Sequence, residues 1–418
     1  MMSVVTDSPV HSSSSDDFIA FLDAALDANS PDASSDKEDG NQDEFESVRI
    51  KRRKFESVEE TEGSTSEGTK ERNLEASVEV DVCTHPGSFG HMCIRCGQKL
   101  DGDSGVTFGY IHKGLRLQDE EISRLRDTDM KNLLLRKKLN LVLDLDHTLL
   151  NSTHLVHLSS EELHLHTQTD SLGDVSKGSL FKLEHMHMMT KLRPFVRTFL
   201  KEANEMFEMY IYTMGDRPYA LEMAKLLDPQ GEYFNAKVIS RDDGTQKHQK
   251  GLDVVLGQDS AVLILDDTEH QFGFNCKSLA ELKSDEDETD GALSKILKVL
   301  KQVHCTFFDK LQDDLVVRDV RQVLSSLRSE VLNGCVIVFS RIFHGALPAL
   351  RKMAEQMGAT CLTELEPSVT HVVATDAGTE KSRWAVKENK FLVHPRWIEA
   401  ANYFWQKQPE ENFFLKKK

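Results

Sequence analysis

Two pairs of aspartates stand directly after short apolar runs of the sequence. Asp144 and Asp146 follow one run, and Asp266 and Asp267 follow another. If both runs are buried strands, the four carboxylates converge in one crevice, where they repel one another unless a cation lies between them. Oxygen ligands select a hard ion, and clustered carboxylates with room for water and a phosphate suit Mg²⁺ better than zinc. These four residues therefore predict a Mg²⁺ site.

A site of this composition can perform covalent phosphoryl transfer. One carboxylate attacks phosphorus and forms an aspartyl-phosphate, and a second carboxylate protonates the leaving oxygen. The transition state spreads negative charge over the phosphoryl oxygens, which need hydrogen-bond donors and positive charge. Thr213 can donate a hydroxyl group from the end of a third apolar run, and Lys250, on a helix expected at 247–256, can supply the charge. An Asp-x-Asp-x-Thr motif alone would be a surface turn, but here the other groups follow it in order.

The apolar runs alternate with segments of helical periodicity. Strands are expected at 139–144, 209–212 and 261–265, and helices at 119–139, 196–206 and 219–227. This alternation, with polar residues at the strand ends, describes a doubly wound α/β sheet whose site lies at the carboxyl ends of the strands. Between the first two strands, residues 151–190 carry six histidines without a ligand spacing, which we interpret as the polar side of a helical insertion (154, 157, 164, 166, 185 and 187).

A second group of residues could bind a different metal. Cys93 and Cys96 have the two-residue spacing that lets both thiolates reach one tetrahedral ion, and Cys83 and His85 could supply the other two ligands. Soft nitrogen and sulfur ligands indicate zinc in a closed, structural site. The single residue between Cys83 and His85 is unusual, so a turn without metal is an equally weighted alternative.

The chain has 418 residues, which is too long for one ordinary core, and two or three units are expected. It has no run of 18 apolar residues, so no membrane span is expected, and the first residues lack the features of a secretory signal. Seven cysteines in a chain of this length do not form a disulfide scaffold, which favours a reducing compartment.

The net charge of −18 argues against general binding of nucleic acid, but it is unevenly spread. Residues 1–48 carry twelve acidic residues against one lysine, and we expect this acidic tail to be disordered. The basic cluster at 49–54 that follows is accessible in such surroundings, which predicts a nuclear-import signal; the alternative is a charge-balancing run in a linker.

Several separated motifs resemble one family in the order expected for it. They are Asp144-Leu-Asp146-His-Thr148, Lys191-Leu-Arg-Pro-Phe, Tyr210-Ile-Tyr-Thr213, Ser240-Arg-Asp-Asp-Gly and Leu265-Asp266-Asp267-Thr. The chain from about 80 to 415 resembles the RNA polymerase II C-terminal-domain phosphatases of the haloacid-dehalogenase superfamily, and is most similar to the plant C-terminal-domain phosphatase-like proteins.

The resemblance implies a role for each site residue. Asp144 would be the nucleophile and Asp146 the general acid and base, while Thr213 and Lys250 would hold the phosphoryl group. Mg²⁺ would bind Asp144, the backbone carbonyl of Asp146 and Asp267, with Asp266 in support. The implied substrate is phosphoserine in the heptad-repeat tail of the largest polymerase subunit, in the nucleus, where the reaction would regulate transcription.

The segment 332–415 has its own strands at 335–339 and 370–374 and helices at 347–357 and 397–404. Gly358, the Thr370-His-Val-Val-Ala motif and Trp397 make it similar to a BRCT domain. Two residues match the positions that bind phosphate in such domains, which implies a phosphopeptide site (Ser340 and Lys381). Many single BRCT domains instead bind partners by packing alone.

These features divide the chain into six regions: an acidic tail with a basic cluster (1–78), a Cys/His segment (79–100), a helical lead-in (101–139), a catalytic domain (140–276), a helical segment (277–331) and a BRCT-like domain (332–416). Helices in the fifth region are expected at 291–302 and 317–332.

One stretch departs from the family pattern. After Asp267, residues 268–276 run almost directly into a helical segment, so a strand and its loop are expected to be missing. A lost strand would expose apolar surface and a bare sheet edge. The alternative function is therefore a catalytically impaired, transcription-associated binding protein that acts through the BRCT-like domain. The expected partners are the phosphorylated polymerase tail and transcription factors, with neither a nucleic acid nor a membrane. A small-molecule phosphatase is disfavoured by the tail and the BRCT-like unit.

Overall fold

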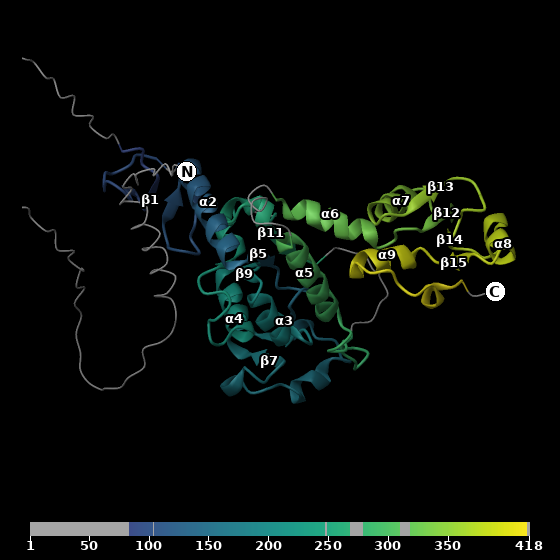
Figure 1. The fold of residues 1–418 in the computed structure, drawn as a ribbon. Helices are drawn as coiled ribbons and strands as arrows, with labels where there is room; N and C mark the ends of the chain where they lie inside the picture. Colours follow the sequence, from purple (N-terminus) through teal and green to yellow (C-terminus); the bar gives the residue numbers. More distant parts are fainter. Residues whose placement is uncertain (1–82, 103, 247–248, 268–278, 310–317, 416–418) are drawn as a thin grey trace, which may run out of the picture. The chain divides into compact units, whose positions relative to one another are not determined.

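The computed structural model describes residues 83–102, 104–246, 249–267, 279–309 and 318–415 (Figure 1). The predictions for the acidic tail, for the basic cluster at 49–54 and for the stretch at 268–276 lie outside these residues. In the described part, no helix has the length and apolar character needed to cross a bilayer.

A four-stranded parallel sheet lies at the centre of the catalytic region, as the alternation of strands and helices predicts. Its strand order is β10-β9-β5-β11, so β5, which comes first in the sequence of these four, lies inside the sheet. In the register, Leu143 on β5 pairs with Ile211 on one neighbour and with Leu265 on the other. The strands are β5 (Leu139–Leu143), β9 (Phe207–Tyr212), β10 (Val238–Ile239) and β11 (Val262–Leu265).

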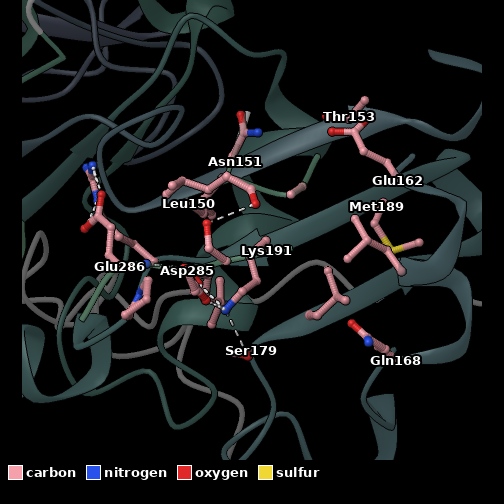
Figure 2. A pocket seen from close by; sticks show the side chains of 18 of the residues that line it. Leu150, Asn151, Thr153, Glu162, Gln168, Ser179, Met189, Lys191, Asp285 and Glu286 are labelled. Atoms are coloured by element: carbon pink, nitrogen blue, oxygen red, sulfur yellow. Dashed lines mark hydrogen bonds and ion pairs between the residues drawn. The ribbon is translucent and has the colours of Figure 1, made fainter. Parts of the chain in front are cut away.

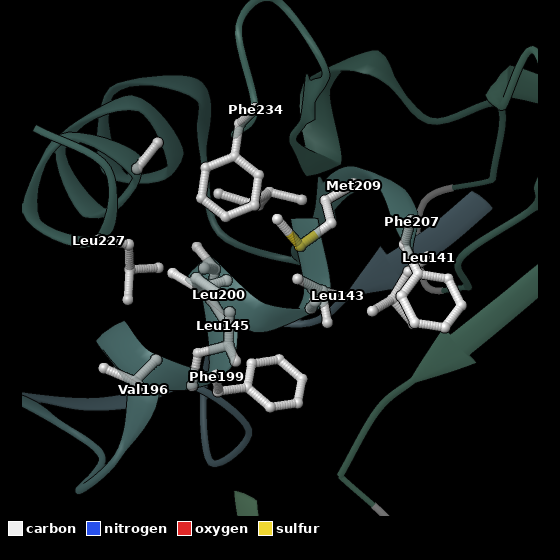
Figure 3. Close-up of a cluster of buried hydrophobic side chains, with 14 of the residues drawn as sticks. Leu141, Leu143, Leu145, Val196, Phe199, Leu200, Phe207, Met209, Leu227 and Phe234 are labelled. Atoms are coloured by element: carbon white, nitrogen blue, oxygen red, sulfur yellow. The ribbon is translucent and has the colours of Figure 1, made fainter. Parts of the chain in front are cut away.

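Different elements pack against the two faces of this sheet. Leu141 and Leu143 point into the larger hydrophobic core (Figure 3). Residues of helices α3, α4 and α5 complete this core. Val142, between them, points to the opposite face, where helix α2 packs. Each fully buried leucine contributes about 2 kcal/mol to folding. The helices are α2 (Asp119–Arg136), α3 (Val196–Asn204), α4 (Arg217–Leu227), α5 (Ala292–Phe308) and α6 (Val320–Glu330), the last of which adds Val320 to the larger core.

A small antiparallel sheet, which the sequence analysis did not predict, precedes α2. Its order is β2-β1-β4-β3, and we call residues 83–118 the N-terminal module. Phe108, Leu115 and Leu117 of this module are fully buried and share a core with Val142 and Tyr210 of the central sheet. The module is therefore part of the structure that supports the central sheet. Its strands are β1 (Gly87–Phe89), β2 (Met92–Cys93), β3 (Val106–Thr107) and β4 (Leu115–Leu117).

The insertion between β5 and α3 contains a three-stranded antiparallel sheet with the order β6-β8-β7. The helical character predicted for the insertion is limited to short 3-10 helices, and the six histidines on it are exposed or half-buried. Strands form here because Phe181 and Leu183 are buried in the larger hydrophobic core. The elements are β6 (Leu150–His154), β7 (Leu180–Leu183), β8 (Met188–Leu192), η1 (Leu155–His157), η2 (Leu163–Thr167), η3 (Leu172–Asp174) and η4 (Glu184–Met186).

The C-terminal unit has its own parallel sheet, with the order β13-β12-β14-β15. Trp397 is fully buried and stacks on the ring of His371 at a centroid distance of 4.6 Å. Gly358 follows α7 with a φ of +89°, as predicted for the end of that helix, and a Cβ there would lie 1.8 Å from the carbonyl oxygen of Ser329. The elements are β12 (Val336–Ser340), α7 (Leu347–Gln356), β13 (Thr360–Leu362), β14 (His371–Ala374), α8 (Glu380–Lys387), β15 (Phe391–Val393), α9 (Arg396–Phe404) and η9 (Glu410–Phe413).

Candidate active site

The carboxylates of Asp144, Asp266 and Asp267 meet at the carboxyl edge of the central sheet. Asp144 follows β5 and the aspartate pair follows β11, which is the parallel neighbour of β5. The Asp144 amide donates to the Leu265 carbonyl at 2.9 Å, which aligns the two strand ends. One carboxylate oxygen from each of the three aspartates lies within 4.8 Å of the others. The structure thus brings together three of the four acidic side chains predicted to share a cation.

Lys250 lies between two of these carboxylates. Its Nζ atom is 2.6 Å from Oδ1 of Asp144 and 2.9 Å from Oδ2 of Asp266. Burial raises the pKa of Asp144 above its ordinary value, and the hydrogen bond from Lys250 only partly offsets this. Burial alone would lower the pKa of Lys250, but both carboxylates raise it above its ordinary value. Lys250 therefore stays charged and places one positive charge beside the Asp144 oxygens.

The third carboxylate shows the electrostatic cost of the cluster. Burial, and then the neighbouring Asp266, raise the pKa of Asp267 above its ordinary value. Lys250 pairs with Asp144 and Asp266, so a second cation would relieve the remaining repulsion among the three carboxylates.

The loop that carries Lys250 corrects the prediction of a helix at 247–256. In the described residues, this segment has a single 3-10 turn, η6 (Leu252–Val254). Its carbonyl groups bind side chains from elsewhere: the guanidinium of Arg126 donates to Leu252, Asp253 and Val255, and the hydroxyl of Tyr110 donates to Val254 at 2.8 Å. These carbonyls are thus held in a loop geometry by α2 and the N-terminal module. The remaining 3-10 helices of the catalytic region are η5 (Arg241–Asp243) and η7 (Asp259–Ala261).

The side chain of Asp146 lies outside the three-carboxylate group. Its Oδ1 atom is 2.5 Å from the hydroxyl oxygen of Tyr219 on α4. Burial, and then the charge of Asp146, raise the pKa of Tyr219 far above its ordinary value, so the phenol remains a donor. The two aspartates of the motif therefore occupy different surroundings, one beside Lys250 and the other beside a tyrosine.

Thr213 and Thr148 supply hydroxyl groups at the same edge of the sheet. Thr213 directly follows β9, the other neighbour of β5, and is fully buried; its Oγ1 atom accepts a hydrogen bond from the Gly215 amide at 3.0 Å. Thr148 Oγ1 lies 3.4 Å from Oδ2 of Asp144. The predicted threonine thus stands at the strand end where the sequence places it.

Tyr219 and Arg193 are site residues that sequence reasoning did not single out. Arg193 donates to the carbonyl oxygens of His147 and Thr148, each at 2.9 Å, and forms a two-pronged ion pair with Glu286. It thereby fixes the loop between Asp144 and β6. Its position in the Lys-Leu-Arg-Pro motif was the available signal.

A cavity of about 780 Å³ lies beside this loop (Figure 2). Its wall contains His147 from the loop after β5 and Arg193 directly after β8, with Asn151 and Lys191 from the insertion sheet and Glu286 from the segment after 278. Both charge signs and apolar side chains line it, so it offers space for a short stretch of polypeptide.

The predicted metal-binding cysteines and histidine also come together. One potential ligand atom from each of Cys83, His85, Cys93 and Cys96 lies within 4.8 Å of the others. Burial raises the pKa of Cys93, but hydrogen bonds from the Cys96 amide and from His85 lower it to about 6.

In the C-terminal unit, the predicted phosphate-binding residues stand at the end of β12 and at the start of α8. Ser340 Oγ lies 2.8 Å from Oγ1 of Thr379, the N-cap of α8. Lys381 donates to the carbonyl oxygen of Thr363 at 2.6 Å. Neither side chain therefore projects freely into solvent.

Comparisons with known proteins agree with this architecture. Residues 139–313 match the NLI interacting factor-like phosphatase family, and residues 327–401 match the BRCA1 C Terminus (BRCT) domain. RNA polymerase II C-terminal domain phosphatase-like 4 of Arabidopsis thaliana is 58% identical over 99% of this chain and 98% of its own length. This chain belongs to the RNA polymerase II C-terminal domain phosphatase-like family.

Other members of the phosphatase-like family are more distant. Phosphatase-like 3 of the same plant is 39% identical over 72% of this chain and 27% of its own length, and an RNA polymerase II C-terminal domain phosphatase of Caenorhabditis elegans is 29% identical over 81% and 57%. The fission yeast structure of Fcp1, an RNA polymerase II CTD phosphatase, superposes with a TM-score of 0.54 at 23% identity, over 70% of this chain and all of that one. It shows that the folds are alike, which agrees with the predicted α/β class with a doubly wound parallel sheet.

The alignment with phosphatase-like 4 covers 445 positions, more than the 418 residues of this chain. That relative therefore has residues without a counterpart here, and the missing strand after Asp267 stays a prediction.

Proposed function

We propose that this protein is a Mg²⁺-dependent phosphatase that removes phosphate from serines in the C-terminal heptad repeats of RNA polymerase II. The named relatives support the substrate, and the geometry of Asp144 supports the chemistry. Asp144 has one oxygen 2.6 Å from the Lys250 ammonium and lies in a group with two further carboxylates. That single arrangement carries the proposal, because it provides a nucleophile beside positive charge at the edge of an α/β sheet.

The residues present fit Mg²⁺. The group contains only carboxylate oxygens, which a hard ion prefers, and a cation would balance the charge of Asp266, which together with burial raises the pKa of Asp267. Asp144, Asp267 and the backbone carbonyl of Asp146 would hold the ion, with Asp266 in support. When bound, Mg²⁺ would neutralise charge on the phosphoryl oxygens.

The chain's own residues perform the transfer. A carboxylate oxygen of Asp144 forms a bond to phosphorus as the bond to the serine oxygen breaks, and Asp146 gives its proton to that oxygen. Asp146 then takes a proton from water, the water oxygen bonds to phosphorus, and the bond to Asp144 breaks to release phosphate. Lys250 and Thr213 stabilise the charge on the phosphoryl oxygens in both steps.

The cavity beside the aspartate loop supports a polypeptide substrate. Its wall includes His147, which lies between the proposed acid Asp146 and Thr148, so residues flanking a phosphoserine have space next to the reacting group. This substrate implies a nuclear location and encounters with transcription factors. The BRCT-like unit supports such encounters, with Ser340 and Lys381 as candidates for binding phosphate if Thr379 and Thr363 release them.

The test uses heptad peptides phosphorylated at one defined serine and the full chain. Phosphate release should require Mg²⁺, stop with chelator and fall at least ~1,000-fold in Asp144→Asn. Asp259→Asn, at the opposite end of β11, is the matched control and should keep full activity. Hydrolysis of an aryl phosphate reports the same chemistry without the peptide. A folded wild-type protein without chelator-sensitive release would instead favour the impaired, BRCT-dependent binding protein.

A further inference from the structure

The four Cys and His side chains of the N-terminal module have the spacing of a tetrahedral metal site. Zinc–sulfur and zinc–nitrogen bonds of about 2.3 and 2.0–2.1 Å place a sulfur and a nitrogen ligand roughly 3.6 Å apart in a tetrahedron. Sγ of Cys96 lies 3.5 Å from Nδ1 of His85. All four potential ligand atoms lie within 4.8 Å of one another, so a small contraction would close the site around one ion.

The backbone around Cys93 is shaped for this purpose. Cys93 ends the β1–β2 hairpin, where it pairs with Ser88. The Arg95 amide points at Sγ of Cys93 at 3.4 Å, and the Gly97 amide donates to the Cys93 carbonyl at 3.0 Å. Gly97 has a φ of +71°, which a residue with a side chain adopts with difficulty. This tight turn presents Cys93 and Cys96 to the same point.

We propose that Cys83, His85, Cys93 and Cys96 bind one zinc ion as a closed structural site, separate from the acidic cluster that holds Mg²⁺. Three sulfurs and one imidazole nitrogen form a soft ligand set, which selects zinc over Mg²⁺. Four protein ligands fill the tetrahedron and leave no position for substrate or water, so the ion has a structural and not a catalytic role.

The module needs such a cross-link. Its strands have only two or three residues each, and sheets this short are marginal by themselves. The ion would tie residues 83 and 85, before β1, to the β1–β2 hairpin. The same module carries Tyr110, which binds the Val254 carbonyl of the lysine loop. The zinc site thus stabilises the module that contacts the Lys250 loop.

The first measurement is the metal content of the full-length protein, purified without chelator under reducing conditions. Elemental analysis should give about one zinc per chain after dialysis. Replacement with Co²⁺ should produce the intense thiolate-to-cobalt charge-transfer absorption of a tetrahedral sulfur-rich site, which carboxylates cannot produce. This spectrum separates the proposed site from zinc held by the acidic cluster, and Asp267→Asn should leave it unchanged.

Variants locate the site. Cys96→Ser should lose most of the bound zinc, whereas Cys305→Ser, which alters an exposed thiol on α5, should retain it. His85→Cys should retain zinc because it keeps four ligands, although a non-glycine residue there must keep a φ of +50°.

A zinc content well below one ion per chain would overturn the proposal. A Co²⁺-substituted protein that lacks the charge-transfer absorption would also overturn it. Unchanged zinc in Cys96→Ser would also overturn it. If Cys96→Ser fails to fold, the cobalt spectrum of the wild-type protein and the zinc content of His85→Cys still decide the question. The result is independent of phosphatase activity, so the proposed function and the zinc site can fail separately.

Discussion

The hydroxyl oxygen of Tyr219 lies 2.5 Å from Oδ1 of Asp146, and the Ser152 Oγ atom lies 2.9 Å from the same hydroxyl. Because the raised pKa of Tyr219 keeps its proton in place, the phenol donates to the carboxylate and Ser152 can donate to the phenol oxygen. This pair fixes the rotamer of the proposed general acid. Asp144, two residues earlier, is instead held by Lys250.

Tyr219→Phe should therefore lower kcat for phosphopeptide hydrolysis about tenfold, with a much smaller change in KM. The variant removes the hydrogen bond that fixes the rotamer of the proposed general acid, so proton transfer to the leaving oxygen loses its alignment. Steady-state kinetics measures kcat and KM.

Tyr233→Phe is the matched control, because Tyr233 is half-buried and its ring packs on Phe234. It should leave kcat unchanged. An equal kcat in the two variants would remove Tyr219 from the proposed role and leave it as a packing residue.

Lys250→Met should reduce kcat at least ~100-fold, since the transition state loses its fixed positive charge. The methionine also leaves three carboxylates without their lysine, so Mg²⁺ should raise the unfolding temperature more in the variant than in the wild-type protein. Thermal unfolding with and without Mg²⁺ tests the second effect even where activity is too low to measure.

Lys237→Met provides the comparison. Lys237 is as buried as Lys250, with 22% against 19% side-chain exposure, and pairs with Glu208 at 2.9 Å. It should keep its activity and show the wild-type response to Mg²⁺. An equal response in both lysine variants would mean that Lys250 does not screen the carboxylates.

Arg126→Met should lower kcat roughly tenfold while leaving the bound zinc in place. The variant removes the hydrogen bonds that hold the carbonyls of Leu252, Asp253 and Val255, and a misplaced Lys250 costs transition-state stabilisation. Arg124→Met, two residues away on α2, removes an ion pair with Glu121 and should leave kcat unchanged. Kinetics and metal analysis on the two variants separate an effect on the loop from an effect on the module.

The convergence of Asp144 with Asp266 and Asp267 was predictable because it depends on two features visible in a sequence. Apolar runs of four to six residues mark buried parallel strands, and the residues that follow such strands meet at one edge. The approach of Cys93 to Cys96 was predictable because it is local.

Contacts between distant segments were not predictable in this way. Tyr219 and Asp146 are 73 residues apart, and no spacing rule joins a helix residue to a loop residue at that distance. The Arg126 contacts go to backbone carbonyls, which every residue carries, and they replace the helix that local periodicity predicted around Lys250. Strand β3 (Val106–Thr107) is too short to show any period.

The C-terminal unit should lose stability as the pH falls below 6.5. Burial lowers the pKa of His371 below its ordinary value of 6.5, and the neighbouring Glu410 does not fully compensate. Below pH 6.5, the unfolded chain binds a proton at His371 more readily than the folded unit does. The free energy of unfolding therefore has its full value above pH 6.5 and decreases below it, by up to about 1.4 kcal/mol per pH unit. Urea unfolding monitored by tryptophan fluorescence reports this unit selectively, because all three tryptophans of the chain lie in it (Trp384, Trp397 and Trp405).

His394 affects the same measurement, because burial and then Arg396 lower its pKa too. It therefore also makes the free energy of unfolding decrease as the pH falls. The comparison is therefore made in a His394→Gln background, with and without His371→Gln. The pKa of Glu410 is lowered because its hydrogen bonds to Lys407 and His371 outweigh burial. The contribution of Glu410 to the free energy of unfolding is lost only below its ordinary pKa of 4.5, so the measurements stay above pH 5. The free energy of unfolding should depend less steeply on pH in the double variant than in His394→Gln alone. Equal slopes would mean that His371 titrates in the folded unit as it does in the unfolded chain, despite its stacking between Phe391 and Trp397.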